Sequence, residues 1–195
     1  TPNLHAADQS CARLPLTANF HFIKSCNFAC NYCYATFADS LARPILGDGQ
    51  LFALTRLLAA RYTKVTFVGG EPTLYPRLPE LLATAKAQGA LTNVVTNGSR
   101  IDAAWLEQHA GTLDLLTLSI DSASPATHRT LGRATRRGET LPVRHYGDLA
   151  DAARAAGVGV KVNTVVTTIN ADEDLTDLIT DLAPQRWKIL QAAPV

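Results

Sequence analysis

The sequence predicts an α/β protein whose parallel strands form a partial (βα)6 barrel of the TIM type. Apolar, strand-like runs alternate along the chain with segments in which leucine and alanine recur at helical spacing. The connections are short, and glycine follows several of the expected helices and strands. Such strand–helix repeats form a parallel sheet with helices outside it, either an open doubly wound sheet or a barrel. Six expected strands favour the partial barrel.

The elements follow one another in chain order from an expected flexible leader, residues 1–15, and residues 16–195 form the barrel. The expected strands are 18–23, 65–68, 93–96, 113–120, 158–166 and 187–190. The expected helical faces are Leu51/Leu54/Leu57/Leu58, Leu78/Leu81/Leu82/Ala85, Trp105/Leu106, Leu149/Ala152/Ala153/Ala156 and Leu175/Leu178/Ile179/Leu182. Residues 133–147 are rich in arginine, glycine and histidine without an apolar period, which predicts a long functional or mobile loop.

Composition limits the function classes. A chain of 195 residues with 47% hydrophobic residues is long enough for one well-packed domain. The formal net charge of +1 gives no general attraction to nucleic acid or to anionic membranes. No apolar run approaches the roughly 18 residues that a membrane span needs. We therefore expect a cytoplasmic, monomeric protein with neither a nucleic-acid nor a membrane partner.

Three of the four cysteines stand within eight positions, directly after the first expected strand. The spacing of Cys26, Cys30 and Cys33 is C-x3-C-x2-C, which lets three thiolates converge on one inorganic centre. Three ligands leave one iron of a four-iron cluster free to bind a substrate or cofactor. The alternative is structural zinc, which needs a fourth ligand; His21 is a candidate, and Cys11 reads as an ordinary thiol. The spacing favours an iron–sulfur cluster.

Polar residues collect where the expected strands end, which is where parallel α/β folds place their functional groups. The turn Gly69-Gly70-Glu71 follows the second strand, Thr96-Asn97 the third and Ser119 the fourth. Asp121, just beyond, has the simpler expectation of capping the next helix. The histidines at positions 5, 109, 128 and 145 have no ligand spacing, and we expect them at the surface.

Four cations lie on or beside three of the strands: Lys64, Lys161, Arg186 and Lys188. Arg186 and Lys188 are two residues apart and so share one face of their strand. If that face is the barrel interior, the charges need an anion, and a polyphosphate supplies one. If it is the outer face, they are solvated or lie between helices. Asn163 shares the face of Lys161 and would bind a ribose hydroxyl or a phosphate oxygen.

Two motifs together resemble the radical S-adenosylmethionine enzymes. The cysteine spacing with aromatic Tyr32 before the last cysteine is that family's signature, and Gly69-Gly70-Glu71-Pro72 is similar to its GGEP motif. The resemblance implies a partial (βα)6 barrel and a [4Fe-4S] cluster held by Cys26, Cys30 and Cys33. It also implies that S-adenosylmethionine on the free iron is reductively cleaved to a 5'-deoxyadenosyl radical, with an electron donor of flavodoxin or ferredoxin type.

Four further strings are similar to viperin and its microbial relatives. They are Asn19-Phe20-His21-Phe22, Thr96-Asn97-Gly98-Ser99, Lys161-Val162-Asn163-Thr164-Val165 and Arg186-Trp187-Lys188-Ile189-Leu190-Gln191. The resemblance implies dehydration of a nucleoside triphosphate to its 3'-deoxy-3',4'-didehydro form, an antiviral chain terminator. Other radical reactions, such as peptide modification or glycyl-radical activation, are the alternative, and a structural zinc module is the non-enzyme alternative.

The same resemblance assigns site residues. Val68 departs from the viperin pattern, which has serine there; the membrane-binding N-terminal helix of animal viperin and a C-terminal segment that covers the barrel mouth are expected to be absent. The expected cofactor-binding residues are Tyr32, Gly69, Gly70, Glu71, Thr96, Asn97, Ser119 and Arg133. The expected substrate-binding residues are Asn19, Lys64, Lys161, Asn163, Arg186 and Lys188.

Overall fold

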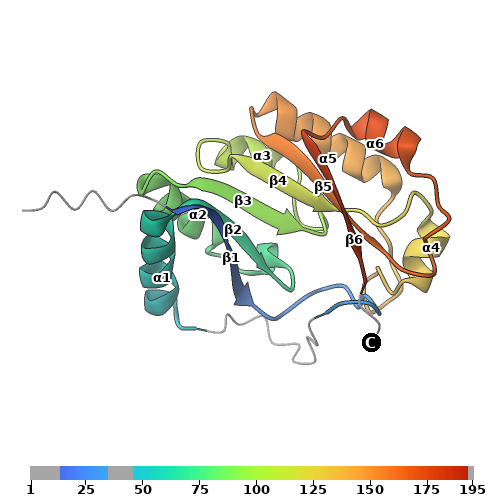
Figure 1. The fold of residues 1–195 in the computed structure, drawn as a ribbon, viewed down its shortest axis with the longest axis horizontal. Coiled ribbons are helices and arrows are strands. Elements are labelled where there is room, and N and C mark those ends of the chain that lie inside the picture. The colour runs from blue at the N-terminus through green and yellow to red at the C-terminus, as the bar shows by residue number, and fades with distance from the viewer. Residues whose placement is uncertain (1–13, 35–45, 193–195) are drawn as a thin grey trace, which may run out of the picture.

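Six strands form one parallel sheet in the computed structural model, which describes residues 14–34 and 46–192 (Figure 1). The sheet order is β1-β2-β3-β4-β5-β6, and every neighbouring pair is parallel. A doubly wound sheet reverses its order part-way, whereas a barrel keeps the chain order. Within the described ranges β1 and β6 are the sheet edges, so the partial barrel is confirmed. The strands are β1 (Leu14–Ile23), β2 (Tyr62–Gly69), β3 (Leu91–Thr96), β4 (Leu115–Ser119), β5 (Gly159–Val166) and β6 (Arg186–Gln191).

The helices lie along the outer side of the curved sheet (Figure 1). Apolar side chains of helices and strands meet there in one core, to which β2 contributes Val65 and Phe67 and α2 contributes Leu81 and Leu82. The hydrophobic core therefore lies between sheet and helices, on the convex side. The helices are α1 (Asp48–Arg61), the 3-10 turn η1 (Pro72–Leu74), α2 (Leu78–Ala87), α3 (Ala103–His109), α4 (Pro125–Thr130), α5 (Val143–Ala155) and α6 (Thr176–Leu182).

Strand alternation decides which side chains face the concave side. In β5, Val160, Val162 and Thr164 are buried, whereas Lys161 and Asn163 between them are only partly buried. Successive side chains of a strand point to opposite faces, so the apolar set packs under the helices and the polar set points to the concave side. The amphipathic pattern of the sequence thus turns the barrel interior into a polar surface.

Several boundaries differ from the sequence prediction. Helix α4 was not expected, because its six residues are too short to show an apolar period. Helix α5 begins at Val143, inside the segment predicted as a loop over 133–147. Strand β1 begins at Leu14, inside the predicted leader; residues 1–13, with His5 and Cys11, lie outside the described residues. No helix in the described part of the chain is both long and apolar enough to cross a membrane.

The expectation of a surface position is wrong for His128, which is completely buried. Its ring stands edge-on to Tyr146, with 6.4 Å between the ring centroids. Burial, followed by the charge of Arg133, lowers the pKa of His128 to about 4. Of the other histidines expected at the surface, His109 and His145 are partly buried, and His145 Nε2 lies 2.9 Å from the carbonyl oxygen of Gly98.

This burial predicts an acid-sensitive fold. Between the ordinary histidine pKa of about 6.5 and the folded-state value of about 4, the unfolded chain binds a proton at His128 that the folded chain does not. Stability should therefore fall as the pH drops through this window and stop changing from this source below it. Urea unfolding of wild type and His128→Phe between pH 7 and pH 4 checks this. The variant should show the weaker pH dependence; equal dependence would contradict the prediction.

Candidate active site

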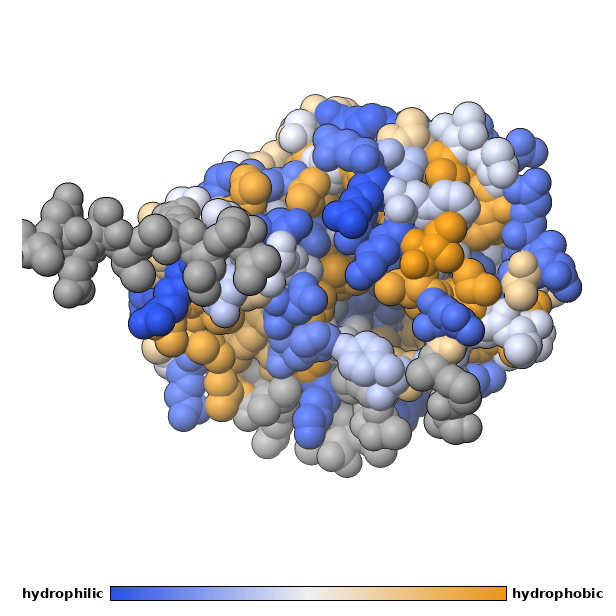
Figure 2. Space-filling view, in the orientation of Figure 1, coloured by the Kyte–Doolittle hydropathy of each residue, from blue (hydrophilic) through white to orange (hydrophobic). Residues whose placement is uncertain are grey.

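The concave side of the sheet contains a cavity of about 720 Å³. Its walls come from all six strands and from the cysteine loop after β1, and the space-filling view shows that this face is hollowed (Figure 2). The sequence-predicted site residues that line it are Asn19, Cys26, Cys30, Tyr32, Cys33, Lys64, Gly69, Gly70, Glu71, Thr96, Asn97, Ser119, Arg133, Lys161, Asn163, Arg186 and Lys188. The structure thus brings every one of them into the same cavity.

The three predicted cluster ligands, Cys26, Cys30 and Cys33, are free thiols that are partly buried at the cavity wall. Burial raises the pKa of the Cys26 thiol to about 11. Burial also raises the pKa of Cys30, although the nearby charge of Arg133 acts in the opposite direction. Thiolates in such a site need a cationic centre to stabilise them, and the iron of a bound cluster would supply it.

The donor set fits an iron–sulfur cluster better than a single metal ion. Among residues 14–34 and 46–192, no three Cys, His, Asp or Glu side chains are close enough to hold one ion together. In a cluster, each thiolate binds a different iron, so the sulfur atoms need not meet at one point. His21, the candidate fourth zinc ligand, instead has its Nδ1 3.0 Å from the hydroxyl of Tyr34.

The glycines after β2 are required by a close approach of backbone. A Cβ on Gly70 would lie 2.1 Å from the carbonyl oxygen of Ser25, and one on Gly69 would lie 2.3 Å from that of Ile23. The Gly70 amide donates a hydrogen bond to the carbonyl oxygen of Ile23 at 2.8 Å. The glycines therefore let the end of β2 run against the start of the cysteine loop, which fixes that loop to the sheet.

Glu71 connects the turn after β2 to the end of β3 through hydrogen bonds. Its carboxylate is 1% exposed and accepts hydrogen bonds from the Thr73 amide and hydroxyl, the Thr96 hydroxyl at 2.8 Å and the Asn97 amide at 2.8 Å. Burial raises its pKa, and these donors oppose the shift. Three of these donors meet Oε1 and one meets Oε2, so Glu71 fixes the end of β3 to the turn after β2.

Asp121 joins the site although the sequence suggested only a helix cap; Ser124 caps α4 instead. Its carboxylate pairs with the Arg133 guanidinium at 3.0 Å, and the two side chains are 1% and 5% exposed. It also accepts hydrogen bonds from the Tyr32 hydroxyl and, at 2.6 Å, from the Val165 amide. Asp121 therefore ties the cysteine loop, β5 and the 131–142 connection together.

Arg133 completes this network. Its guanidinium donates to the carbonyl oxygen of Ser119 and lies 5.9 Å from the centroid of the Phe28 ring. Opposite charges at Asp121 raise its pKa despite the opposing effect of burial. A buried cation with its pair and neighbours fixed in this way forms a rigid wall of the cavity next to the cysteines.

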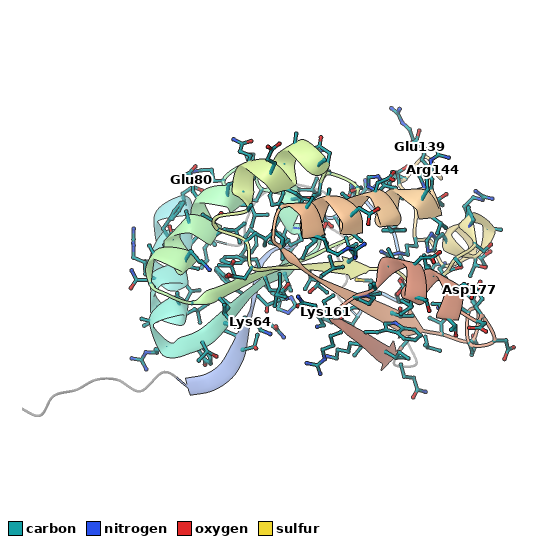
Figure 3. The ribbon with its side chains drawn as sticks, turned by 90° about the horizontal axis from the view of Figure 1, so that it is seen from above. Lys64, Glu80, Glu139, Arg144, Lys161 and Asp177 are labelled. Atoms are coloured by element: carbon teal, nitrogen blue, oxygen red, sulfur yellow. The ribbon has the colours of Figure 1, made fainter. Side chains whose placement is uncertain are left out.

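The four predicted cations gather in the same cavity. Figure 3 shows Lys64 and Lys161 close together on the concave side, and β5 and β6 pair Lys161 with Arg186 and Asn163 with Lys188. Burial lowers the pKa of Lys161, and the charges of Lys188, Arg186 and Lys64 lower it further. Of the alternatives for these cations, the interior position is the one found, and their mutual repulsion calls for an anion.

A row of polar side chains on the inner face of the sheet was not predicted from the sequence. Asn93 Nδ2 donates to Thr66 Oγ1 at 3.4 Å, and Thr117 Oγ1 donates to Asn93 Oδ1 at 2.8 Å. All three side chains are buried. Thr66 follows Lys64 at the strand period of two on β2, which was a signal in the sequence. Asn93 and Thr117 lie on other strands, where the register pairs Asn93 with Thr66 and Thr117 with Lys161.

Comparisons with known proteins agree with this site. The sequence profile of the Radical SAM superfamily matches residues 20–182. A protein of Flammeovirga pacifica named S-adenosylmethionine-dependent nucleotide dehydratase is 40% identical over 186 residues, which cover 92% of this chain and 63% of that protein. One of Danio rerio with a corresponding name is 35% identical over 182 residues, 91% of this chain and 50% of that protein. The chain thus spans between half and two-thirds of these relatives.

Solved structures show the same fold at low sequence identity. The protein anSMEcpe, solved with AdoMet and the Kp18Cys peptide bound, superposes with a TM-score of 0.75 at 20% identity, and the match covers 92% of this chain and 52% of that one. Streptococcus suis SuiB, bound to S-adenosylmethionine, gives a TM-score of 0.74 at 20% identity, over 93% of this chain and 42% of that one. Sheet order, cysteine loop and family profile agree, and the chain belongs to the radical SAM superfamily.

Proposed function

We propose that the chain dehydrates a nucleoside triphosphate to its 3'-deoxy-3',4'-didehydro form by radical chemistry. The observation that carries the proposal is a single cavity with three thiols on its wall and four cations, Lys64, Lys161, Arg186 and Lys188. Thiols of this spacing suit a radical-generating centre, and the cations suit a polyphosphate. The names of the relatives, S-adenosylmethionine-dependent nucleotide dehydratases, support the same reading.

The residues at the cysteine end fit the implied cofactors. When bound, a [4Fe-4S] cluster and S-adenosylmethionine supply a 5'-deoxyadenosyl radical that removes the 4'-hydrogen of the ribose. Cys26, Cys30 and Cys33 would hold the cluster. Around it, Ser119 and Asn97 line the cavity and offer polar groups to S-adenosylmethionine, while Arg133 is held by Asp121.

The arrangement of the strands gives the substrate a direction. Lys64 and Lys161 are the third residues of β2 and β5, near the amino ends of the strands, whereas the cysteines follow the carboxyl end of β1. A triphosphate on the cations therefore lies toward the amino ends of the strands, and its ribose points toward the cysteines. Hydrogen abstraction needs close contact between radical and ribose, and rigid strands provide it.

Asn163 occupies the level between the two ends. Its strand register places it beside Ser119 on one side and Lys188 on the other. Its Oδ1 atom is buried and has no hydrogen-bond donor among the described residues. The side-chain amide carries both a donor and an acceptor, so it suits a ribose hydroxyl or a phosphate oxygen. We propose Asn163 and Asn19, which both line the cavity, as substrate-binding residues.

The decisive assay is anaerobic incubation of the cluster-loaded protein with S-adenosylmethionine, dithionite and each nucleoside triphosphate in turn. We expect 5'-deoxyadenosine together with a nucleotide that has lost one water, both detected by mass spectrometry. Formation of 5'-deoxyadenosine without any dehydrated nucleotide would reject the dehydratase and favour another radical reaction, such as peptide modification. Gel filtration and cell fractionation test the proposals of a monomer and of a cytoplasmic location.

A Lys161→Ala variant tests the polyphosphate site. Loss of a charge-assisted contact of about 1.5–3 kcal/mol should weaken triphosphate binding by roughly 10- to 150-fold. The control is Lys24→Ala, since Lys24 is exposed and does not line the cavity. Isothermal titration with a nucleoside triphosphate measures both variants. Equal affinities for the two would place the triphosphate elsewhere, and the visible cluster absorbance should be unchanged in both.

A further inference from the structure

Residues 129–144 form an arginine-rich segment that the proposed reaction does not use. Four of its five arginines are exposed, and Glu139 is its single carboxylate, in a chain whose net charge is only +1. The fifth, Arg133, is buried and paired with Asp121. The exposed arginines are Arg129, Arg136, Arg137 and Arg144. No ion pair of these four is found within residues 14–34 and 46–192.

The segment is bound directly to the cysteine loop. The Ala29 amide donates a hydrogen bond to the carbonyl oxygen of Ala134 at 3.2 Å, and the Asn31 amide donates one to the carbonyl oxygen of Leu131 at 3.0 Å. Phe28 also forms an isolated antiparallel β-bridge with Thr135. Phe28 is two residues from Cys26 and two from Cys30. Bridge and chain geometry therefore place the Thr135 Cα within roughly 13 Å of the Cα atoms of both cysteines.

Arg136 and Arg137 stand at the tip of an ordered turn. The Gly138 amide donates a hydrogen bond to the carbonyl oxygen of Thr135 at 2.8 Å, and the Thr135 amide donates one to the carbonyl oxygen of Glu139 at 2.9 Å. Gly138 has a φ of +79°. Charges on a turn held in this way need little ordering when a partner binds. Neither arginine lines the cavity, although Arg133 in the same segment does. The segment thus has an inner side at the cavity and an outer side in solvent.

The view from above separates the two regions. Glu139 and Arg144 appear at the periphery of the molecule, whereas Lys64 and Lys161 lie on the concave side of the sheet (Figure 3). A protein on the outer side of the segment would stand close to the cysteines without blocking the cavity. This arrangement suits delivery of an electron while cofactor and substrate occupy the cavity.

We propose that the arginine-rich segment is the docking surface for a small acidic electron-carrier protein. One electron leaves the reduced carrier and enters the oxidised cluster, and no atom moves between the two proteins. Opposite charges steer such an encounter and raise its rate. Nucleic acid is the poorer partner, because residues 129–144 contain no aromatic side chain on which a base would stack.

The test compares cluster reduction by a protein donor and by a small one. In the full-length, cluster-loaded protein, the double variant Arg136→Glu/Arg137→Glu is matched with Arg56→Glu/Arg61→Glu, two exposed arginines of α1. Reduction is followed anaerobically by electron paramagnetic resonance, without nucleotide, using a pre-reduced acidic [2Fe-2S] ferredoxin or dithionite. At low salt we expect the segment variant to be reduced by ferredoxin at least about tenfold more slowly, at a normal rate by dithionite, and the control to be unaffected.

The outcomes that overturn the inference are distinct. Equal ferredoxin rates in both variants would remove the docking surface, and equal slowing with ferredoxin and dithionite would mean that the turn acts on the cluster loop itself. A normal ferredoxin rate with loss of binding to single-stranded RNA would replace the carrier by nucleic acid. The inference rests on the proposed function only through the need for a reduced cluster. Because the readout omits nucleotide, its failure leaves the dehydratase proposal standing, and the reverse also holds.

Discussion

A Cys30→Ala variant is expected to lose the iron–sulfur cluster and, with it, all formation of 5'-deoxyadenosine. The protein supplies three thiolate ligands, one for each of three irons, and the fourth iron is left open to S-adenosylmethionine. Two thiolates are too few to hold the cluster. Visible absorbance and iron content after anaerobic reconstitution measure the first effect, and chromatography of the reaction mixture measures the second.

The same variant should still fold, because the cysteines are not part of the hydrophobic core between sheet and helices. Its far-ultraviolet circular dichroism should match that of the wild type without cluster. Cys11→Ala is the matched control, since the sequence gives this cysteine no ligand spacing, and it should keep the cluster and the activity. A Cys30→Ala protein that retains iron in full yield would refute the ligand assignment.

An Asp121→Ala variant is expected to be among the most destabilising single changes in the chain. It leaves the buried Arg133 guanidinium without its carboxylate and removes the acceptor of the Tyr32 hydroxyl and the Val165 amide. Breaking a buried ion pair by removing one partner costs about 3–5 kcal/mol. Urea unfolding of the cluster-free protein gives the loss directly.

Asp151→Ala is the control for this experiment. Asp151 also pairs with an arginine, Arg154 at 2.6 Å, but its side chain is 78% exposed. Exposed pairs contribute little to stability, so the midpoint of unfolding should barely change. Asp121→Asn should fall between the two, because it keeps a side-chain oxygen for hydrogen bonding but loses the charge. Similar midpoints for Asp121→Ala and Asp151→Ala would contradict a central role for Asp121.

Features that depend on residues close together in the sequence were predictable from it. The cysteine loop, the glycine turn after β2 and the inward face of β5 each depend on residues a few positions apart, and each lies where it was expected. The strand order also followed, because short connections in a parallel sheet leave few other arrangements.

Features that depend on distant partners were not predictable. Asp121 meets Tyr32 across 89 positions of sequence, and no local pattern records that contact. His128 lies in the unpredicted helix α4 and packs against Tyr146 of α5. A single histidine gives no periodic signal, so its burial appears only when α4 is placed against its neighbours.

The location of the hydrophobic core has a consequence for how such a chain changes over time. The apolar residues of the hydrophobic core lie on the helix side of the sheet, and inward strand residues such as Lys161 and Asn163 face the cavity on the other side. Neighbouring positions of one strand, such as Val162 and Asn163, are thus under different kinds of selection: the first for packing in the core, the second for contact with the ligand. Substitutions at the inward positions exchange ligand contacts without opening holes in the core. Apart from the buried Asp121–Arg133 pair, whose loss is expected to destabilise the fold, inward positions can therefore change ligand preference while the folding free energy stays nearly unaltered.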